Sequence, residues 1–544
     1  MIKRFFASKN KFIPILFITF FGLSLLLFFS TFYVDKEGNI NIAGKLWSDF
    51  GSTFPIIRSF SKGYNFPPEY PIFSGRPIRY HFVFYALVGL FEKMGLRIDL
   101  ALNGLSALSF AALLTIIYLF ALKLFKKHSV AVVSIVLFLF NGTLGFLEFF
   151  KKNPLSWATP IEIFKNKNFT SFGPYDGKTV SAFWNLNIFT NQRHLALAYA
   201  FFIGILYFFY AVDKKPDKFS VNKALVLGLL IGFFPYIHMA VFGMLLVLLG
   251  IVFLVYPKIR LKIILTLVVA ITVAFPQVVY MGKSEIETEL LRPGYLVIPL
   301  TVGNFFSYWF YNLGLNLFLP ILGFFLAKKS GRKVFLPFVA LFVIGNIFNF
   351  SPDIATNHKF FNLYLIGAAM FSAYFLNILW NIKIIGKILA PICLLLLTLS
   401  GIIEFFPVIN DGHLNVRDIK NNASADFIAK NTPKNSVFLN SKFLYDNANI
   451  AGRRIYMGWP YFSWGAGYDT TKREKTMKRM LNPSSKGEAC LLLTQEGIEF
   501  IETQSPADLL DYEINYTFFE ENFVKVFSNP SDNVNIYAVS GSCS

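Results

Sequence analysis

The stretch LWSDFGSTFPIIRSF, residues 46–60, places one carboxylate among aromatic residues. Apolar side chains recur in it at spacings of three and four, which predicts a helix whose apolar face consists of Trp47, Phe50, Phe54 and Ile57. Asp49 falls outside that face, so a helix lying in a membrane interface would hold its carboxylate toward water or a cavity. A carboxylate placed in this way has the chemistry of a general base. The alternative is that Asp49 only caps or solubilises a surface helix.

A second set of polar residues stands at the ends of later apolar segments. It contains the cations Arg193, Arg292 and Lys359, the imidazoles His81, His194 and His238, and the amide Asn357. Ionisable groups at membrane depth are costly, so their gathering at one end of several helices indicates a site for an anion or a proton. Singly, each has a structural interpretation. Arg193 and Lys359 suit snorkelling anchors, and His238 suits a packing residue at a break caused by proline.

These side chains need a membrane-embedded scaffold to position them. Of the 544 residues, 55% are hydrophobic, 15% are charged and 66 are Phe, which exceeds what one soluble core can bury. The first apolar run, Phe12 to Val34, is too long for a signal peptide and lacks a cleavage site, so we expect a retained helix. Runs of about 20 residues fit a bilayer about 30 Å thick. They predict a polytopic α-helical membrane protein with about eleven spans, near residues 12–34, 99–122, 129–150, 192–212, 222–236, 238–256, 261–281, 301–327, 334–350, 359–381 and 388–408.

The formal net charge of +19 reports topology and not a nucleic-acid partner. With the N-terminus in the cytoplasm and the chain alternating, the inner segments hold twenty Lys and Arg residues against two acids, Asp213 and Asp217. Eighteen of the nineteen net charges therefore lie inside, as the positive-inside rule requires. We expect a multi-pass protein of the cell (plasma or inner) membrane, with short basic inner loops and the larger segments outside.

Those larger outer segments are residues 35–98, 151–191 and the C-terminal part of the chain. The sequence predicts a membrane domain over 1–408, which includes the first two, and a soluble extracytoplasmic α/β domain over 409–544. Strand-like runs in that domain are SVFLNS, ACLLLT, FVKVFS and NIYAVS, and helix-like runs are ASADFIAK, TKREKTMKRML and PADLLDYE. Cys490 and Cys543 both fall in it, where an oxidising environment permits a disulfide, although two cysteines alone do not require one.

Motifs for cytosolic energy sources are missing from the sequence. No HxxxH, CxxC or GxSxG motif stands in a suitable context, and no P-loop faces the cytoplasm, which argues against ATP. An outer site would then need a substrate that carries its own activation and arrives within the membrane.

In its layout the chain resembles the GT-C fold of polyprenyl-phosphate-sugar-dependent glycosyltransferases, a superfamily with protein O-mannosyltransferases and aminoarabinose transferases. The likeness rests on WSDFGSTFPIIRSF with NFPPEYPIFSGRPIRYHF in the first outer loop, and on NTPKNSVFL and AGRRIYMGW in the outer domain. The family's acidic residue on the first outer loop matches Asp49. Many members carry two acids there, whereas this chain has Ser48, Asp49 and Phe50, so a second acid would come from Glu69, Glu162 or Asp176.

The resemblance implies transfer of a sugar from a polyprenyl-phosphate donor to an acceptor hydroxyl on the outer face of the membrane. Asp49 would take the acceptor's proton, and Arg193, Arg292 and Lys359 would meet the charge of the departing phosphate. His81, His194, His238, Asn357 and Glu69 would contact the substrate. The partners implied are the lipid-linked donor, a glycan, lipid or protein acceptor, and membrane lipids, without nucleic acid. No cofactor is required, and a divalent metal ion stays open because the second acid is unassigned.

Three other functions are consistent with parts of the sequence. A lipid-carrier oligosaccharide ligase shares the same features. A transporter predicts inverted repeats and broken helices near the bilayer midplane, whereas the polar groups here crowd one end of the spans. A non-catalytic envelope-assembly protein predicts that Asp49 and the basic residues do not converge.

Overall fold

The computed structural model describes residues 12–171, 179–509 and 512–543, and these form two compact units. Unit 1 comprises residues up to Thr31, Leu105–Pro276 and Thr288–Gly412. Unit 2 comprises Phe32–Gly104, Gln277–Glu287 and His413–Ser544. The segment 35–98 falls in unit 2 together with the C-terminal part of the chain.

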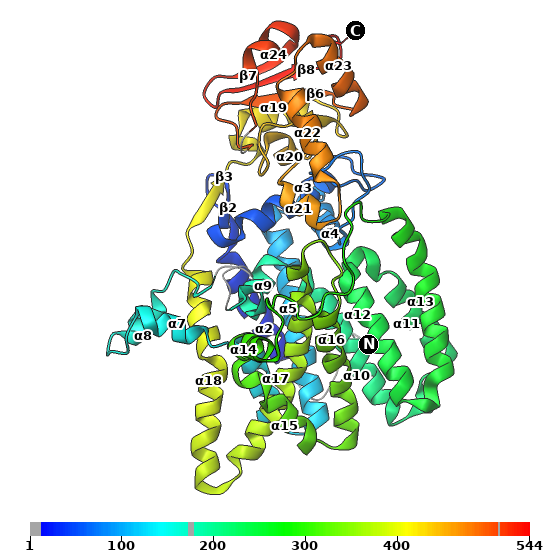
Figure 1. Ribbon diagram of the computed structural model, residues 1–544, viewed down its shortest axis with the longest axis vertical. Coiled ribbons are helices and arrows are strands. Elements are labelled where there is room, and N and C mark those ends of the chain that lie inside the picture. Colours follow the sequence, from blue (N-terminus) through cyan, green and yellow to red (C-terminus); the bar gives the residue numbers. More distant parts are fainter. Residues whose placement is uncertain (1–11, 172–178, 510–511, 544) are drawn as a thin grey trace. The chain divides into compact units, whose positions relative to one another are not determined.

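The predicted polytopic helical architecture is confirmed, although fewer of the described helices than the eleven expected spans are long and apolar enough to cross a membrane (Figure 1). Among the described residues, eight helices are long and apolar enough to cross a membrane, and one bent pair makes up a ninth. The eight are α2 (Phe12–Phe29), α5 (Ile98–Phe125), α10 (Leu195–Asp213), α12 (Phe234–Val255), α13 (Arg260–Met281), α16 (Lys329–Ile347), α17 (His358–Trp380) and α18 (Lys383–Ile409). The pair is α14 (Val302–Leu313), continued by a 3₁₀ turn to Leu317, and α15 (Leu319–Leu326), with a bend of 46°.

Two predicted spans are shorter than the sequence suggested. The run 129–150 divides into α6 (His128–Leu139) and α7 (Gly145–Lys152), and the run 222–236 gives the 12-residue α11 (Val221–Gly232). Two tertiary contacts lie at the first division. The backbone N–H of Asn185 bonds to the side-chain oxygen of Asn141, and Gly142 lies so close to Leu397 that an added Cβ would stand 2.4 Å from its carbonyl oxygen.

The break predicted around FFPYIHMA is confirmed, since only Phe233 separates α11 from α12. Pro235 lies in the first turn of α12, where its missing N–H costs nothing. Three residues later His238 has non-helical φ/ψ of −169° and 99°, which marks a kink. Short α11 is held by close packing on α13: Cβ atoms at Gly228 and Gly232 would meet the Cβ atoms of Val269 and Val273 at 2.7 and 2.6 Å.

Helix α17 forms the centre of unit 1. It packs against α6, α15, α16 and α18, and its side chains are buried almost continuously from Phe360 to Ala373. Shorter helices α8 (Thr159–Phe164) and α9 (Asn185–Asn191) complete the segment 151–191.

In unit 2 a three-stranded antiparallel sheet ties the segment after α2 to the start of the C-terminal part. Strands β1 (Phe32–Val34), β2 (Ile40–Ala43) and β3 (His413–Val416) lie in that order, with Ile40 opposite Val416. Helices α3 (Trp47–Ser61) and α4 (Val83–Lys93) follow β2 and pack on each other. This pairing explains why the segment 35–98 clusters with the C-terminal part of the chain.

The predicted α/β domain contains a five-stranded mixed sheet of order β5-β4-β6-β8-β7 (Figure 1). Its strands are β4 (Val437–Leu439), β5 (Arg454–Ile455), β6 (Phe500–Gln504), β7 (Val524–Asn529) and β8 (Val534–Ala538). The helices are α19 (Ala423–Asn431), α20 (Asn447–Ile450), α21 (Pro460–Gly465), α22 (Thr470–Leu481), α23 (Lys486–Gln495) and α24 (Tyr516–Asn522). Cys490 and Cys543 form a disulfide.

One predicted strand in this domain is wrong. The run ACLLLT lies in helix α23, because Ser485 caps the helix and accepts a hydrogen bond from the N–H of Glu488 three residues later. The run PADLLDYE, expected to be helical, includes residues 510–511 outside the described part, and the described remainder contains no helix.

Beneath the five-stranded sheet, Asp446 and Glu502 form a fully buried carboxyl pair. Asn447 donates a 2.8 Å hydrogen bond to Glu502 Oε1. Burial raises the pKa of both carboxyl groups, and the neighbouring Asp446 raises the pKa of Glu502 further. The pair therefore holds protons in the folded state at a pH where free carboxyl groups would have lost them.

We expect this pair to make stability fall as pH rises. Because the folded pKa values are raised, the contribution is fully present below about pH 4, where unfolded carboxyl groups titrate, and is lost as pH rises through the folded values. Glu502→Gln keeps an acceptor for Asn447 and removes one titration, so unfolding temperatures measured from pH 4 to 8 should fall less steeply. Glu521→Gln, at an exposed position, should behave like the native protein. Equal slopes in all three proteins would contradict the expectation.

Candidate functional site

Asp49 lies in the first turn of α3, where the helix dipole favours a negative charge. Its side chain is partly buried, and its backbone carbonyl accepts hydrogen bonds from the hydroxyls of Ser52 (2.8 Å) and Thr53 (3.1 Å). These bonds hold the first turn of α3 in one conformation. The position of the carboxylate is therefore set by local backbone structure.

Two partly buried tyrosines lie within electrostatic range of Asp49. Burial raises the pKa of Tyr80 and of Tyr445 well above the ordinary value, Tyr85 raises that of Tyr80 further, and Asp49 raises both. The phenol of Tyr445 also donates a 2.5 Å hydrogen bond to the carbonyl of Trp47, two residues before Asp49. Both phenols consequently stay protonated and serve as hydrogen-bond donors near the carboxylate. The sequence analysis did not single out either tyrosine.

Helix α3 is more deeply buried than an interfacial helix with one wet face. Phe50 and Phe54 are buried as predicted, and Phe50 contacts Phe32 with ring centroids 5.2 Å apart. Ser52 and Ser59, which are not part of the predicted apolar face, are buried as well. Their hydroxyls donate to carbonyls of the same helix, so burying them leaves no bond unmade.

The far end of α3 is anchored by Arg58, whose side chain is only 1% exposed. Its guanidinium lies 3.3 Å from Glu92 of α4 and 2.8 Å from Asp418 in the chain after β3. It also lies over the ring of Phe54, 5.0 Å from the centroid. A single buried cation thus joins three parts of unit 2 that are far apart in sequence.

Replacing Arg58 should lower the free energy of unfolding substantially. Arg58→Met leaves the buried carboxylate of Glu92 without its main partner, and breaking a buried ion pair costs roughly 3–5 kcal/mol. Thermal unfolding of the purified protein measures the loss. Arg417→Met removes an ion pair to Asp532 whose Arg side chain is 50% exposed, and should cost about 1 kcal/mol or less. An Arg58 variant as stable as the Arg417 variant would contradict the anchoring role.

The other two sequence-predicted site residues of unit 2 have different surroundings. The carboxylate of Glu69 pairs with the guanidinium of Arg454 and accepts a 2.9 Å bond from the N–H of Gly75. The ring of His81 lies against that of Tyr80, with centroids 3.7 Å apart. Of the other candidate acids, Glu162 lies on α8 in unit 1, and Asp176 falls outside the described residues.

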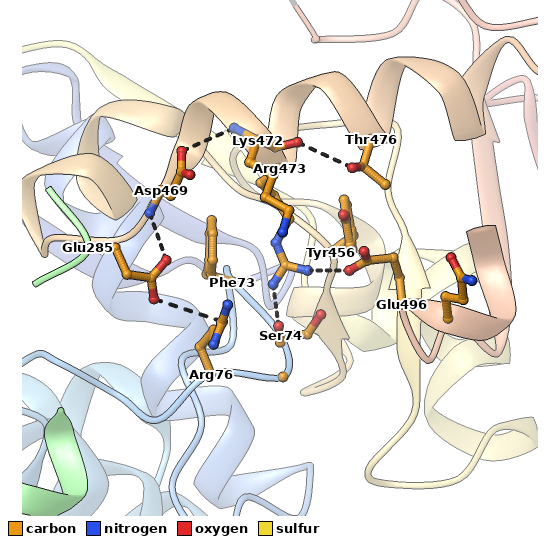
Figure 2. Close-up of a pocket in the computed structure, with 12 residues that line it drawn as sticks. Phe73, Ser74, Arg76, Glu285, Tyr456, Asp469, Lys472, Arg473, Thr476 and Glu496 are labelled. Carbon is orange, nitrogen blue, oxygen red and sulfur yellow. Dashed lines mark hydrogen bonds and ion pairs between the residues drawn. The ribbon is translucent and has the colours of Figure 1, made fainter. Parts of the chain in front are cut away.

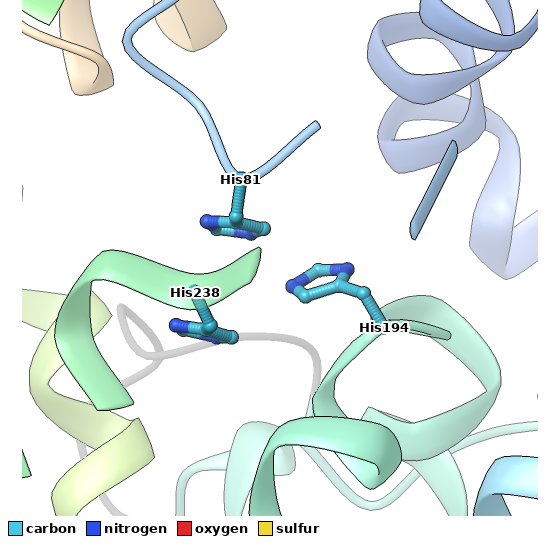
Figure 3. A group of neighbouring side chains, drawn as sticks. All are labelled: His81, His194 and His238. Atoms are coloured by element: carbon cyan, nitrogen blue, oxygen red, sulfur yellow. The ribbon is translucent and has the colours of Figure 1, made fainter. Parts of the chain in front are cut away.

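In unit 1 the structure brings together four sequence-predicted residues. His194 and His238 are buried, and their rings lie 5.2 Å apart (Figure 3). Lys359 lies within electrostatic range of both. Arg193, next to His194, is buried with its guanidinium 4.2 Å from the ring centroid of Phe28. Figure 3 also draws His81, which belongs to unit 2.

These four residues differ in how many hydrogen bonds they make to other residues of the protein. Arg193 donates to the carbonyl of Thr190 at 2.6 Å and to the hydroxyl of Thr31 at 2.8 Å, so part of its guanidinium serves the fold. The backbone carbonyl of Lys359 accepts a 2.6 Å bond from Tyr199, which orients the start of α17. His194 and His238 offer two imidazoles, fewer than the three protein ligands of a typical catalytic zinc site. A metal would thus need ligands beyond this pair.

Two further predicted residues of unit 1, Asn357 and Arg292, both bond to the C-terminal end of α16. The amide of Asn357 donates to the carbonyls of Gly345 (3.0 Å) and Phe348 (2.6 Å), which caps the end of α16. The backbone N–H of Arg292 bonds to Ile347 at 2.9 Å, while its side chain makes no hydrogen bond or ion pair with the described residues. His358, the first residue of α17 and the neighbour of Lys359, contacts Gln192 (3.2 Å) and Asn362 (2.7 Å).

Comparison with solved structures identifies the fold. ArnT from Cupriavidus metallidurans in the apo state, an aminoarabinose transferase, matches with a TM-score of 0.50 at 12% identity, covering 97% of this chain and 98% of that one. The oligosaccharyltransferase of Archaeoglobus fulgidus with a tethered acceptor peptide matches at a TM-score of 0.45 and 10% identity, covering 98% and 74%. No family model and no curated protein matches. The chain therefore has the GT-C fold of a multi-pass membrane protein, as its sequence predicts.

Proposed function

We propose that this protein is a membrane glycosyltransferase that moves a sugar from a polyprenyl-phosphate donor to an acceptor hydroxyl. The observation that carries the proposal is the end-to-end match to ArnT, which covers 97% and 98% of the two chains, with Asp49 in the first turn of a deeply packed helix. The distribution of basic residues supports a site on the outer face of the cell membrane, with the N-terminus inside.

In the proposed reaction the acceptor oxygen attacks the anomeric carbon and the bond from that carbon to the phosphate oxygen breaks. The bonding electron pair leaves with the phosphate, and the acceptor's proton passes to the carboxylate of Asp49. This single displacement inverts the anomeric configuration. The protonated phenol of Tyr80 is a hydrogen-bond donor in the same neighbourhood, whereas the phenol of Tyr445 already donates to the carbonyl of Trp47.

The leaving phosphate needs positive charge. Arg292 is the best-supported candidate, because its side chain makes no hydrogen bond or ion pair with described residues. Lys359 stands beside the histidine pair and supplies a second cation. Arg193 is partly engaged by Thr190 and Thr31, which suits positioning of its neighbourhood more than ligand contact. Preorganised cations at a developing charge are usually a large catalytic contribution.

Asp49→Asn tests the proposal directly. With reconstituted protein and a synthetic polyprenyl-phosphate sugar, transfer should fall about 10²–10⁴-fold, which is the typical contribution of a positioned base. Glu37→Gln, an exposed acid in the same unit, should retain native activity. Full activity of the Asp49 variant would remove it as the base, and absence of transfer by the native protein from each donor tried would count against the transferase function.

The same assay separates two alternatives. A lipid-carrier oligosaccharide ligase would transfer only from donors that carry a preassembled glycan. A transporter is favoured by one specific observation, the 46° bend between α14 with its 3₁₀ turn (Gly314–Leu317) and α15, together with the kink at His238. It predicts movement of the lipid-linked sugar across the bilayer of a proteoliposome without release of polyprenyl phosphate.

A further inference from the structure

A polar pocket of about 280 Å³ lies wholly within unit 2 (Figure 2). Its volume is near the lower end of the range for small-molecule pockets, about 300–1,000 Å³. It is lined by five stretches that are distant in sequence: 73–76, Glu285, Tyr456, the first half of α22 with Asp469 before it, and the end of α23. Asp49 is not among the lining residues.

The guanidinium of Arg473 lines the pocket and is held in place on both faces and at its edge. Arg473 lies between the rings of Phe73 and Tyr456, 4.1 and 4.2 Å from their centroids, and is 10% exposed. It donates to the carbonyl of Ser74 and lies 3.3 Å from Glu496. Stacking on both faces and bonding at the edge hold this group rigidly, so its remaining N–H groups point in fixed directions.

One rim of the pocket is held in place by Glu285. Its carboxylate accepts from Arg79 at 2.9 Å and from the backbone N–H of Asp469 at 3.2 Å. Arg79 in turn donates to the carbonyl of Gly467 at 2.6 Å. The rim is thus preorganised by bonds that join three separate stretches of the chain, which lowers the entropy cost of binding a ligand.

Several lining groups keep hydrogen-bonding capacity for a ligand. The exposed side chains of Lys472 and Gln495 have no partner among the described residues. The hydroxyl of Ser74 is buried and has no hydrogen-bond partner in the described structure, which is costly unless something else supplies one. Arg76 is half-exposed and only 4.0 Å from Glu285 at its nearest approach, so its guanidinium is weakly engaged.

The formal charges of the lining are balanced, which favours a ligand without net charge. Three cations, Arg76, Lys472 and Arg473, stand against three acids, Glu285, Asp469 and Glu496. A lining of this kind gives an anion or an ammonium ion no net electrostatic attraction. A hydroxyl group both donates and accepts, so a neutral polyol can bond to both kinds of side chain at once.

We propose that this pocket binds an uncharged saccharide unit by hydrogen bonding. Stacking contributes little, because the ring of Phe73 is covered by Arg473 and by Tyr468, whose centroid is 4.8 Å away. If the proposed function holds, the saccharide is part of the acceptor, and the pocket anchors the acceptor away from Asp49. That last assignment rests on the proposed function, whereas binding itself does not.

The test is saturation-transfer difference NMR on the full-length protein in lipid nanodiscs. The probes are the methyl glycosides of glucose, galactose, mannose and N-acetylglucosamine, with methyl glucuronide as the anionic comparison. At least one neutral glycoside should bind more tightly than the glucuronide. The double variant Lys472→Met, Gln495→Leu should weaken that binding at least tenfold. Lys475→Met, an exposed lysine of the same helix that does not line the pocket, should bind as the native protein does.

The proposal is overturned if no neutral glycoside binds, if the glucuronide binds more tightly, or if the double variant binds as well as the native protein. Unchanged unfolding temperatures of the variants exclude misfolding as the cause of weakened binding. Asp49→Asn should leave glycoside binding intact, so failure of transfer and failure of the pocket are read separately. Loss of binding in Asp49→Asn would overturn the pocket as an independent site.

Discussion

The arrangement of unit 2 depends on keeping a long segment, residues 35–98, against a region more than 300 residues later in the chain. A buried guanidinium does much of this, because Arg58 lies between Glu92 and Asp418. The desolvation cost of a buried cation is offset only when carboxylates are buried beside it. The Arg58 contacts therefore form in one register of the three elements. The pairing of β2 with β3 fixes the same register through backbone bonds. Together they hold the helix that carries Asp49 in place.

The membrane architecture was predictable because it follows from hydropathy alone. A bilayer demands long apolar helices, and most of the expected spans coincide with helices long enough to cross it. Hydropathy misses where a helix ends inside an apolar run. Helix α6 ends at Leu139, and the contacts just beyond it, of Asn141 with Asn185 and of Gly142 with Leu397, involve partners that are far away in sequence. The helix over ACLLLT shows the opposite case, in which a local cap at Ser485 outweighed an apolar run typical of a strand.

The candidate site was predictable in residue type but not in grouping. The spacing of apolar residues in the stretch 46–60 pointed to Asp49 as a candidate. Polar residues at the ends of apolar runs pointed to His194, His238 and Lys359. Tyr80 and Tyr445 went unnoticed because tyrosine near a membrane has no distinctive pattern, and their value lies in burial beside Asp49. The pairing of β2 with β3, which joins the segment 35–98 to the C-terminal part of the chain, is a long-range contact that local patterns do not reveal.

The candidate site residues can be ranked by whether other parts of the protein already satisfy their polar or charged groups. Glu69 was one option for a second acid, yet its carboxylate already pairs with Arg454, so neutralising a metal ion there would first require breaking that pair. Asn357 is likewise committed to two carbonyls at the end of α16. Arg292, Lys472 and Gln495 lack such partners among the described residues. A polar group that the fold does not use, at a place where the surrounding groups are rigidly held, is the better candidate for ligand contact. On that criterion the neighbourhood of Arg292 in unit 1 and the polar pocket in unit 2 are the better candidates among the described residues.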